Sequence, residues 1–249
     1  MTLLHVDNVS CHFGSLIAVN QVSLRVEPGE LRAVIGPNGA GKTTFFNLIS
    51  GFLPPTKGRI LLDEQDITTL SPQRRVKLGM ARTFQITEIF PELTVRENLR
   101  IPVEIAAGHQ LSPFLSRSAA ARIAAETEEL LEMSGLDKKA DRLVGELSHG
   151  DQRATEIMMS LALKPRLLLL DEPTAGMGDQ ETYDISKLIR KLHRDRSMTI
   201  ILIEHDMRVV FNLADRIMVL AEGATLAEGT PAEIAASERV QAAYLGTAA

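Results

Sequence analysis

The stretch Gly36-Pro37-Asn38-Gly39-Ala40-Gly41-Lys42-Thr43-Thr44 decides the fold of this 249-residue chain. Its glycines, lysine and first threonine fit the spacing G-x-x-x-x-G-K-[ST] of a phosphate-binding loop, or P-loop. Residues 31–35 predict a short buried strand before it, and residues 43–50 predict a helix after it, which Gly51 ends. A strand, a glycine-rich turn and a helix N-terminus direct successive backbone N–H groups at an anion.

We therefore predict that the P-loop binds a nucleotide. Lys42 is expected to reach the β- and γ-phosphates, and the Thr43 hydroxyl is expected to ligate Mg²⁺. The alternative is a glycine-rich turn that contains Lys-Thr by coincidence, and the flanking strand and helix argue against it. The predicted phosphate-binding residues are Gly36, Pro37, Asn38, Gly39, Ala40, Gly41, Lys42, Thr43 and Thr44.

Composition limits the class of protein. Hydrophobic residues make up 45% and charged residues 24%, which is typical of a globular chain with a buried core. No uninterrupted apolar run approaches the roughly 18 residues that span a bilayer, and the N-terminus lacks the pattern of a signal peptide. The single cysteine, Cys11, excludes an intrachain disulfide and a cysteine-cluster metal site, so we expect a reducing cytoplasm.

Charge and aromatic content argue against a nucleic-acid partner. The net charge is −5, aromatic residues make up 4%, and tryptophan is absent from the sequence. The short basic runs Arg74-Arg75 and Lys138-Lys139 are predicted to be solvated surface.

Hydrophobic periodicity predicts strands at both ends of a helical insertion. Residues 3–9 and 17–26 alternate as half-buried strands of an N-terminal antiparallel β subdomain. Residues 86–147 are predicted to be helical, and Thr94 and Glu97 form a capping box there. Further predicted strands are residues 58–62, 80–85, 167–170, 199–203, 217–220 and 224–227; predicted helices are 118–133, 152–163, 181–194, 206–213, 231–236 and 237–244. Strands that alternate with helices around a P-loop imply an α/β fold with a mainly parallel central sheet.

Two acidic residues follow the apolar strand 167–170. Ligands gather at the carboxyl ends of strands in an open α/β sheet, so Asp171 and Glu172 should face the phosphates. We expect Asp171 to hold Mg²⁺ and Glu172 to deprotonate the attacking water. His205 follows the strand 199–203. Its position alone is compatible with two interpretations, a hydrogen bond to the γ-phosphate and a satisfied surface histidine.

The order of these motifs resembles that of the ATP-binding cassette (ABC) ATPases over essentially the whole chain. Its most specific part is the segment Leu147-Ser148-His149-Gly150-Asp151-Gln152-Arg153, because other P-loop enzymes lack it. The other shared elements are the P-loop, Gln85, the run Leu170-Asp171-Glu172-Pro173, and His205. An Asn-Lys-x-Asp motif that would read guanine is absent from the sequence.

The resemblance implies a role for each matching residue. Phe13 matches the aromatic residue that stacks on adenine, and Gln85 matches the glutamine that contacts Mg²⁺ and the attacking water. Ser148 and Gly150 match the signature loop, which binds the γ-phosphate of an ATP held by the opposite subunit. Glu172 corresponds to the catalytic carboxylate and His205 to the switch histidine.

The resemblance also implies the cofactors, the partners and the domain organisation of the chain. The cofactors are ATP and Mg²⁺, and two cassettes pair head to tail, as a homodimer or a heterodimer with a related chain. Residues 1–249 form one ABC ATPase domain, in which 1–85 and 150–249 are the catalytic core and 86–149 are an inserted helical subdomain. The chain is expected at the cytoplasmic face of the inner membrane, bound to separate permease subunits.

Three positions depart from the usual family pattern. His149 replaces a glycine, Asp151 replaces a glutamine, and Gly178 stands where many cassettes have an aspartate. Ser148 and the Gly150 N–H, the groups expected at the phosphate, are retained, so binding is expected to survive. Asp151 adds negative charge near that anion, and weakened activation in trans is the alternative.

Several segments resemble the branch of the family that serves branched-chain amino-acid importers, among them Ala175-Gly176-Met177 and Tyr244-Leu245-Gly246. The predicted function is therefore the ATP-hydrolysing subunit of such an importer. Importers of urea, amides or other small polar solutes remain alternatives. Two other classes of cassette are alternatives. One is a soluble ATPase that acts in DNA repair or translation, and the other is a cassette that does not catalyse hydrolysis.

Overall fold

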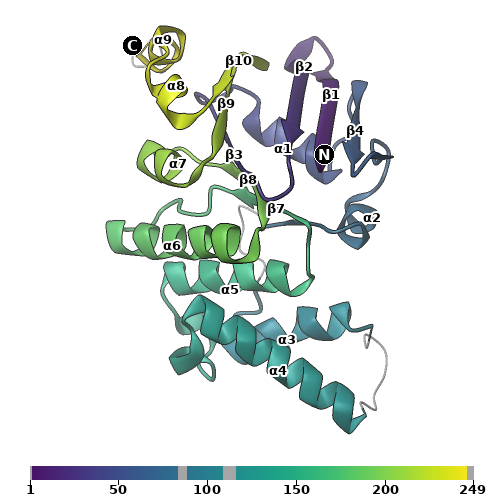
Figure 1. The fold of residues 1–249 in the computed structure, drawn as a ribbon, viewed down its shortest axis with the longest axis vertical. Helices are drawn as coiled ribbons and strands as arrows, with labels where there is room; N and C mark the ends of the chain where they lie inside the picture. The colour runs from purple at the N-terminus through teal and green to yellow at the C-terminus, as the bar shows by residue number, and fades with distance from the viewer. Residues whose placement is uncertain (1, 84–88, 109–115, 246–249) are drawn as a thin grey trace.

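Two β-sheets of different size organise the computed structural model of the chain, which describes residues 2–83, 89–108 and 116–245 (Figure 1). The smaller sheet is antiparallel, with the order β2-β1-β4-β5. Its strands are β1 (Leu4–Phe13), β2 (Leu16–Val26), β4 (Lys57–Leu62) and β5 (Gln65–Asp66).

The larger sheet has the order β10-β9-β3-β8-β7-β6. All its neighbouring pairs are parallel except the hairpin of β9 and β10. Its strands are β3 (Leu31–Ile35), β6 (Met80–Arg82), β7 (Leu167–Asp171), β8 (Thr199–Ile203), β9 (Arg216–Ala221) and β10 (Ala224–Gly229). The predicted mainly parallel sheet and the predicted antiparallel β subdomain are confirmed.

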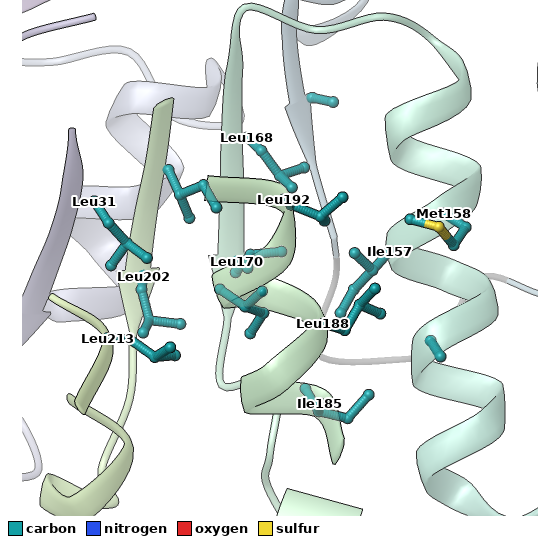
Figure 2. Packing of buried hydrophobic residues seen from close by; sticks show 14 of the residues in the cluster. Leu31, Ile157, Met158, Leu168, Leu170, Ile185, Leu188, Leu192, Leu202 and Leu213 are labelled. Carbon is teal, nitrogen blue, oxygen red and sulfur yellow. The ribbon is translucent and has the colours of Figure 1, made fainter. Parts of the chain in front are cut away.

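Central strands of the larger sheet are buried on both faces. Leu168 and Leu170 of β7 pack with α5 (His149–Ala162) and α6 (Asp179–Arg196), as Figure 2 shows. Leu167 and Leu169 belong to a second cluster, which includes Phe45 of α1 (Lys42–Ser50) and residues of the smaller sheet. A strand covered on both sides needs apolar residues at every position, which explains the unbroken leucine run.

Helices surround the sheets, and several of them lie between β6 and β7 in the sequence. Figure 1 shows α3 (Val95–Ala106) and α4 (Arg117–Ser134) at the end of the molecule opposite α8 (Pro231–Ala235) and α9 (Glu238–Leu245). The capping box of Thr94 and Glu97 is present at the start of α3, as predicted. The remaining helices are α2 (Pro72–Lys77), α7 (Met207–Leu213), and the 3₁₀ turns η1 (Asp137–Lys139) and η2 (Val144–Glu146).

Some predicted boundaries differ from the observed ones, and at α5 a capping side chain gives the reason. Helix α5 begins at His149 and not at residue 152, because the Ser148 hydroxyl accepts a hydrogen bond from the Asp151 N–H and so caps the helix. Strand β5 was absent from the predicted strands. Strand β6 covers Met80–Arg82 of the predicted strand 80–85, and residues 84–88, which include Gln85, lie outside the described residues.

The prediction that the pair Arg74-Arg75 is solvated is wrong for Arg75, whose side chain is fully buried. Burial lowers the pKa of Arg75 to about 10, and the charge of Asp66 opposes this shift. The guanidinium group supplies several N–H donors, so it can bind carbonyls in the last turn of helix α1 and in the segment before α2. Its acceptors are the carbonyl oxygens of Leu48, Ile49, Thr68 and Leu70.

We expect Arg75→Ala to lower the free energy of unfolding by about 3 kcal/mol, because buried carbonyls lose charged donors. Arg74, the exposed neighbour on the same helix, is the matched control. Its replacement by alanine should change stability by less than about 0.5 kcal/mol. Urea-induced unfolding followed by circular dichroism measures both values, and equal losses in the two variants would contradict the capping role.

Candidate active site

The register of the larger sheet brings three strand ends to one level. Val34 of β3 pairs with Ile203 of β8, and Ile203 pairs in turn with Asp171 of β7. Because these strands are parallel, the segments that follow them leave the sheet at the same edge. The P-loop, Glu172 and His205 all lie in those segments.

Glycines let the P-loop run close to neighbouring backbone. Gly36, Gly39 and Gly41 have positive φ angles of 152°, 78° and 95°. A Cβ on Gly41 would lie 2.4 Å from the Ala18 carbonyl oxygen, and one on Gly36 would lie 2.1 Å from that of Leu220. The required glycines of the motif therefore follow from contacts with β2 and β9, as well as from the turn itself.

A cleft of about 590 Å³ opens beside the P-loop. It places Glu172 and His205, which follow the ends of β7 and β8, beside residues of the P-loop, whereas Asp171 is not among its lining residues. Its apolar side is formed by Phe13, Leu16 and Ile17, whose side chains are 49%, 64% and 47% exposed. The other lining residues are Ala18, Asn38, Gly39, Ala40, Gly41, Lys42, Thr43, Thr44, Glu172, His205, Glu222 and Gly223.

Lys42 lies at the floor of this cleft and is buried. Its ammonium group donates to the carbonyl oxygens of Gly36 and Pro37, at 2.7 and 2.9 Å. Burial lowers the pKa of Lys42, and the negative charge of Glu172 opposes that shift. Lys42 and Glu172 both line this cleft.

Glu172 and His205 form a pair in the same cleft. The Nε2 atom of His205 lies 2.6 Å from Oε1 of Glu172. Glu172 has a φ angle of 45°, a left-handed conformation that is uncommon for residues with a side chain. The backbone therefore leaves the extended path of β7 at the residue that carries the carboxylate.

Asp171 is buried, and only one of its carboxylate oxygens is hydrogen-bonded within the described part of the chain. Arg82 donates to Oδ2 at 2.8 Å, while Oδ1 has no partner among the described residues. Burial raises the pKa of Asp171 most strongly, and the hydrogen bond and charge of Arg82 oppose this effect. A buried oxygen without a partner is costly unless a ligand or water completes it.

Sequence reasoning missed several residues that hold this edge together. Glu204 is buried and accepts hydrogen bonds from the N–H and hydroxyl of Thr174 and from the N–H of His205. It therefore joins the segment after β7 to the segment after β8. Its position immediately before His205 was the available signal, because a carboxylate at the end of a buried strand needs partners.

Arg82 and Arg153 were also missed. Besides Asp171, Arg82 contacts Asn47 and Ser50 of α1 through hydrogen bonds. Arg153 belongs to the signature segment, and it donates to the backbone carbonyl of Asp171. The signature helix α5 is thus joined directly to the end of β7.

Ser148 and Gly150 lie away from the nucleotide cleft of their own chain. They line a separate small cavity of about 100 Å³, together with Asp151, Glu181 and other residues of α5 and α6. The structure therefore brings together Phe13, the P-loop, Glu172 and His205, but not the two signature residues. Gln85 lies outside the described residues.

The charge of Asp151 is compensated locally. Lys139 of η1 donates to the Asp151 carboxylate, whose side chain is 19% exposed. Lys139 is thus an ion-pair partner in addition to being partly solvated. This pairing reduces the negative charge that the sequence led us to expect beside the signature loop.

Two family models and several relatives match the chain. A model described as "ABC transporter" matches residues 19–175, and one described as "Branched-chain amino acid ATP-binding cassette transporter" matches residues 224–249. The chain is 42% identical over 252 residues to the high-affinity branched-chain amino acid transport ATP-binding protein LivG of Escherichia coli (strain K12), covering 99% of this chain and 98% of LivG.

Solved structures extend the agreement to the fold. The ADP conformation of MJ1267, an ATP-binding cassette of an ABC transporter, superposes with a TM-score of 0.84 at 30% identity, covering 99% of both chains. A dimeric post-hydrolysis state of the ATP-binding cassette MJ0796, bound to ADP and Pi, has a TM-score of 0.76 at 26% identity, covering 92% of this chain and 98% of that one.

No helix in the described ranges combines the length and apolar character needed to cross a bilayer. With the nucleotide cleft, the fold and the full-length similarity in agreement, the chain belongs to the ABC transporter family, as an ATP-binding ATPase cassette.

Proposed function

We propose that this cassette hydrolyses ATP to drive import of branched-chain amino acids, with the catalytic roles assigned below. The observation that carries the assignment is the cleft itself. It combines the P-loop lysine, Lys42, with the Glu172–His205 pair and with an exposed apolar surface at Phe13. The name of the E. coli relative and the match of residues 224–249 support the choice of solute.

In this proposal Phe13 stacks on the adenine ring. Leu16 and Ile17, exposed on the same side of the cleft, enlarge the apolar surface available to the base. The backbone N–H groups of residues 38–44 then surround the phosphates at the N-terminus of α1. Lys42 exchanges its carbonyl partners, Gly36 and Pro37, for phosphate oxygens, which carry a full negative charge and bind an ammonium more strongly.

Thr43 and Asp171 fit a Mg²⁺ ion bound with the nucleotide. Thr43 is exposed in the cleft, and Oδ1 of Asp171 is a buried oxygen without a partner among the described residues. Within those residues no group of three or more His, Cys, Asp or Glu side chains gathers as a metal cluster. Few protein ligands plus phosphates and waters are typical of Mg²⁺ in ATPases, where the ion neutralises charge on the β- and γ-phosphates. We assign Gln85 to the same ion from the family resemblance.

Glu172 acts in this proposal as the general base for the attacking water. Its Oε1 is bonded to His205, which leaves Oε2 available to accept a proton from water. His205 holds the carboxylate in place and reaches the γ-phosphate when that group enters the cleft. Glu172 then takes a proton from the attacking water while Lys42 stabilises the charge on the β- and γ-phosphates. Both effects favour transfer of the γ-phosphoryl group to water.

Ser148 and Gly150 complete the site of a second cassette. They lie apart from their own chain's cleft, so a head-to-tail pair would bring them to the partner's γ-phosphate. Each active site then contains the P-loop of one chain and the signature loop of the other, in a homodimer or with a related chain. The dimeric MJ0796 structure supports pairing as such.

We assign the helical segment 86–149 to contact with membrane permease subunits at the cytoplasmic face of the inner membrane. Residues 1–85 and 150–249 form the catalytic core in this division. Helix α5 begins at His149, where the helical segment ends, and Arg153 in its second turn donates to the backbone carbonyl of Asp171, which supports communication between the two parts through this helix.

Substitutions in the cleft should separate ATP binding from hydrolysis. Lys42→Ala is expected to abolish binding of a fluorescent ATP analogue and turnover together. Glu172→Gln should retain binding and lose about 10²–10⁴-fold in turnover, because the amide cannot accept the proton. Phosphate release measures turnover. Glu222→Gln removes a carboxylate that lines the same cleft from another turn, and it should remain close to the unchanged protein. Full turnover in Glu172→Gln would refute the assigned base.

Mixing two inactive variants tests head-to-tail pairing. Lys42→Ala removes a P-loop function, and Ser148→Arg blocks a signature loop. A mixed pair contains one site in which both loops are intact, so the mixture should regain about a quarter of the original turnover. Each variant alone is the control. A mixture that stays as inactive as its components, although the chains associate, would exclude sites shared between subunits.

A further inference from the structure

The signature loop already holds an anion of its own chain. The Gly150 N–H donates to Oε1 of Glu181, in the first turn of α6, at 3.1 Å. Hydrogen bonds from the Gly150 N–H and, next, from the Ser148 side chain hold the pKa of Glu181 below its usual range. Glu181 also packs against Gly150, since a Cβ on that glycine would lie 3.2 Å from Cβ and Cγ of Glu181.

These are the two groups that the proposed function assigns to the partner's γ-phosphate. A single N–H directed at a carboxylate cannot donate at full strength to a phosphate oxygen at the same time. We propose that the Glu181 carboxylate is an internal occupant of the signature loop, which the γ-phosphate of the partner's ATP must displace when two cassettes pair. This inference rests on the proposed head-to-tail site.

Neighbouring charges single out Glu181 among the acidic residues of this region. Asp151 is paired with Lys139, and Asp184 accepts a hydrogen bond from Gln180. Glu181 is held by the signature loop itself. The same geometry gives Gly150 a second reason to be glycine, because a side chain there would press on Glu181.

Displacement of Glu181 would also reach the catalytic residue. Glu172 is followed by a short turn, in which the Ala175 N–H donates to the Glu172 carbonyl oxygen, and α6 starts at Asp179. Glu181 lies in that first helical turn. When the partner's phosphate occupies the signature loop of one chain, it therefore acts on the segment that carries Glu172 of that same chain.

ATP-dependent pairing of the full chain tests this inference in a Glu172→Gln background, where ATP is consumed about 10²–10⁴-fold more slowly. Light scattering during titration with ATP gives the concentration at which half of the chains are paired. Adding Glu181→Gln should lower that concentration about tenfold, equivalent to about 1.4 kcal/mol, because a neutral amide is displaced more easily than a carboxylate. ADP, which lacks the γ-phosphate, should not pair either protein.

Asp184→Asn is the matched control. It removes one negative charge from the same helix and the same small cavity, and it should shift the midpoint by less than about twofold. Glu181→Ala should act in the same direction as Glu181→Gln. An unchanged or higher midpoint in both Glu181 variants, with thermal unfolding and single-chain ATP binding intact, would overturn the inference.

The experiment separates this inference from the proposed function. If the Glu172→Gln parent binds ATP and does not pair, the head-to-tail site fails, and the role of Glu181 fails with it. If the parent pairs and the Glu181 variants leave the midpoint unchanged, only the role of Glu181 is overturned.

Discussion

Backbone hydrogen bonds hold β3, β8 and β7 in one parallel register, and the catalytic cleft depends on it. The register sets Val34, Ile203 and Asp171 at one level. The P-loop, His205 and Glu172 then leave the sheet at a common edge. A shift of one residue in a strand would reverse which side chains face each core, so the two-sided burial of these strands fixes the level of the catalytic groups.

Buried charges make that edge rigid. Asp171 is held by Arg82, and Glu204 joins the turn after β7 to His205. Each charge is buried with hydrogen-bonding partners, as the low dielectric of the interior requires. Arg153 adds a connection from the signature helix to the Asp171 backbone, so the two halves of the catalytic machinery are mechanically linked within one chain.

Local patterns predicted the P-loop, the unbroken strand β7 and the caps at Thr94 and Gly51, because neighbouring residues determine those features. Residues whose partners are distant in sequence could not be predicted in the same way. Arg75 donates to the carbonyl of Leu48 at the end of α1, which lies 27 residues earlier in the chain. Lys139 contacts Asp151 only after the insertion folds. Leu16 and Ile17 are likewise exposed at the cleft, whereas the alternation of residues 17–26 predicts an ordinary half-buried strand.

The same tertiary contacts define the resting chain. Lys42 holds carbonyls of its own loop, Glu172 holds His205, and the Gly150 N–H holds Glu181. These groups, which the proposed mechanism directs at ATP, therefore have internal partners first. Binding replaces one hydrogen bond by another, so its net gain comes from the greater charge of the phosphates. Such an exchange favours nucleotides that carry the γ-phosphate, since that group is the one that meets Lys42 in one chain and the signature loop in the other.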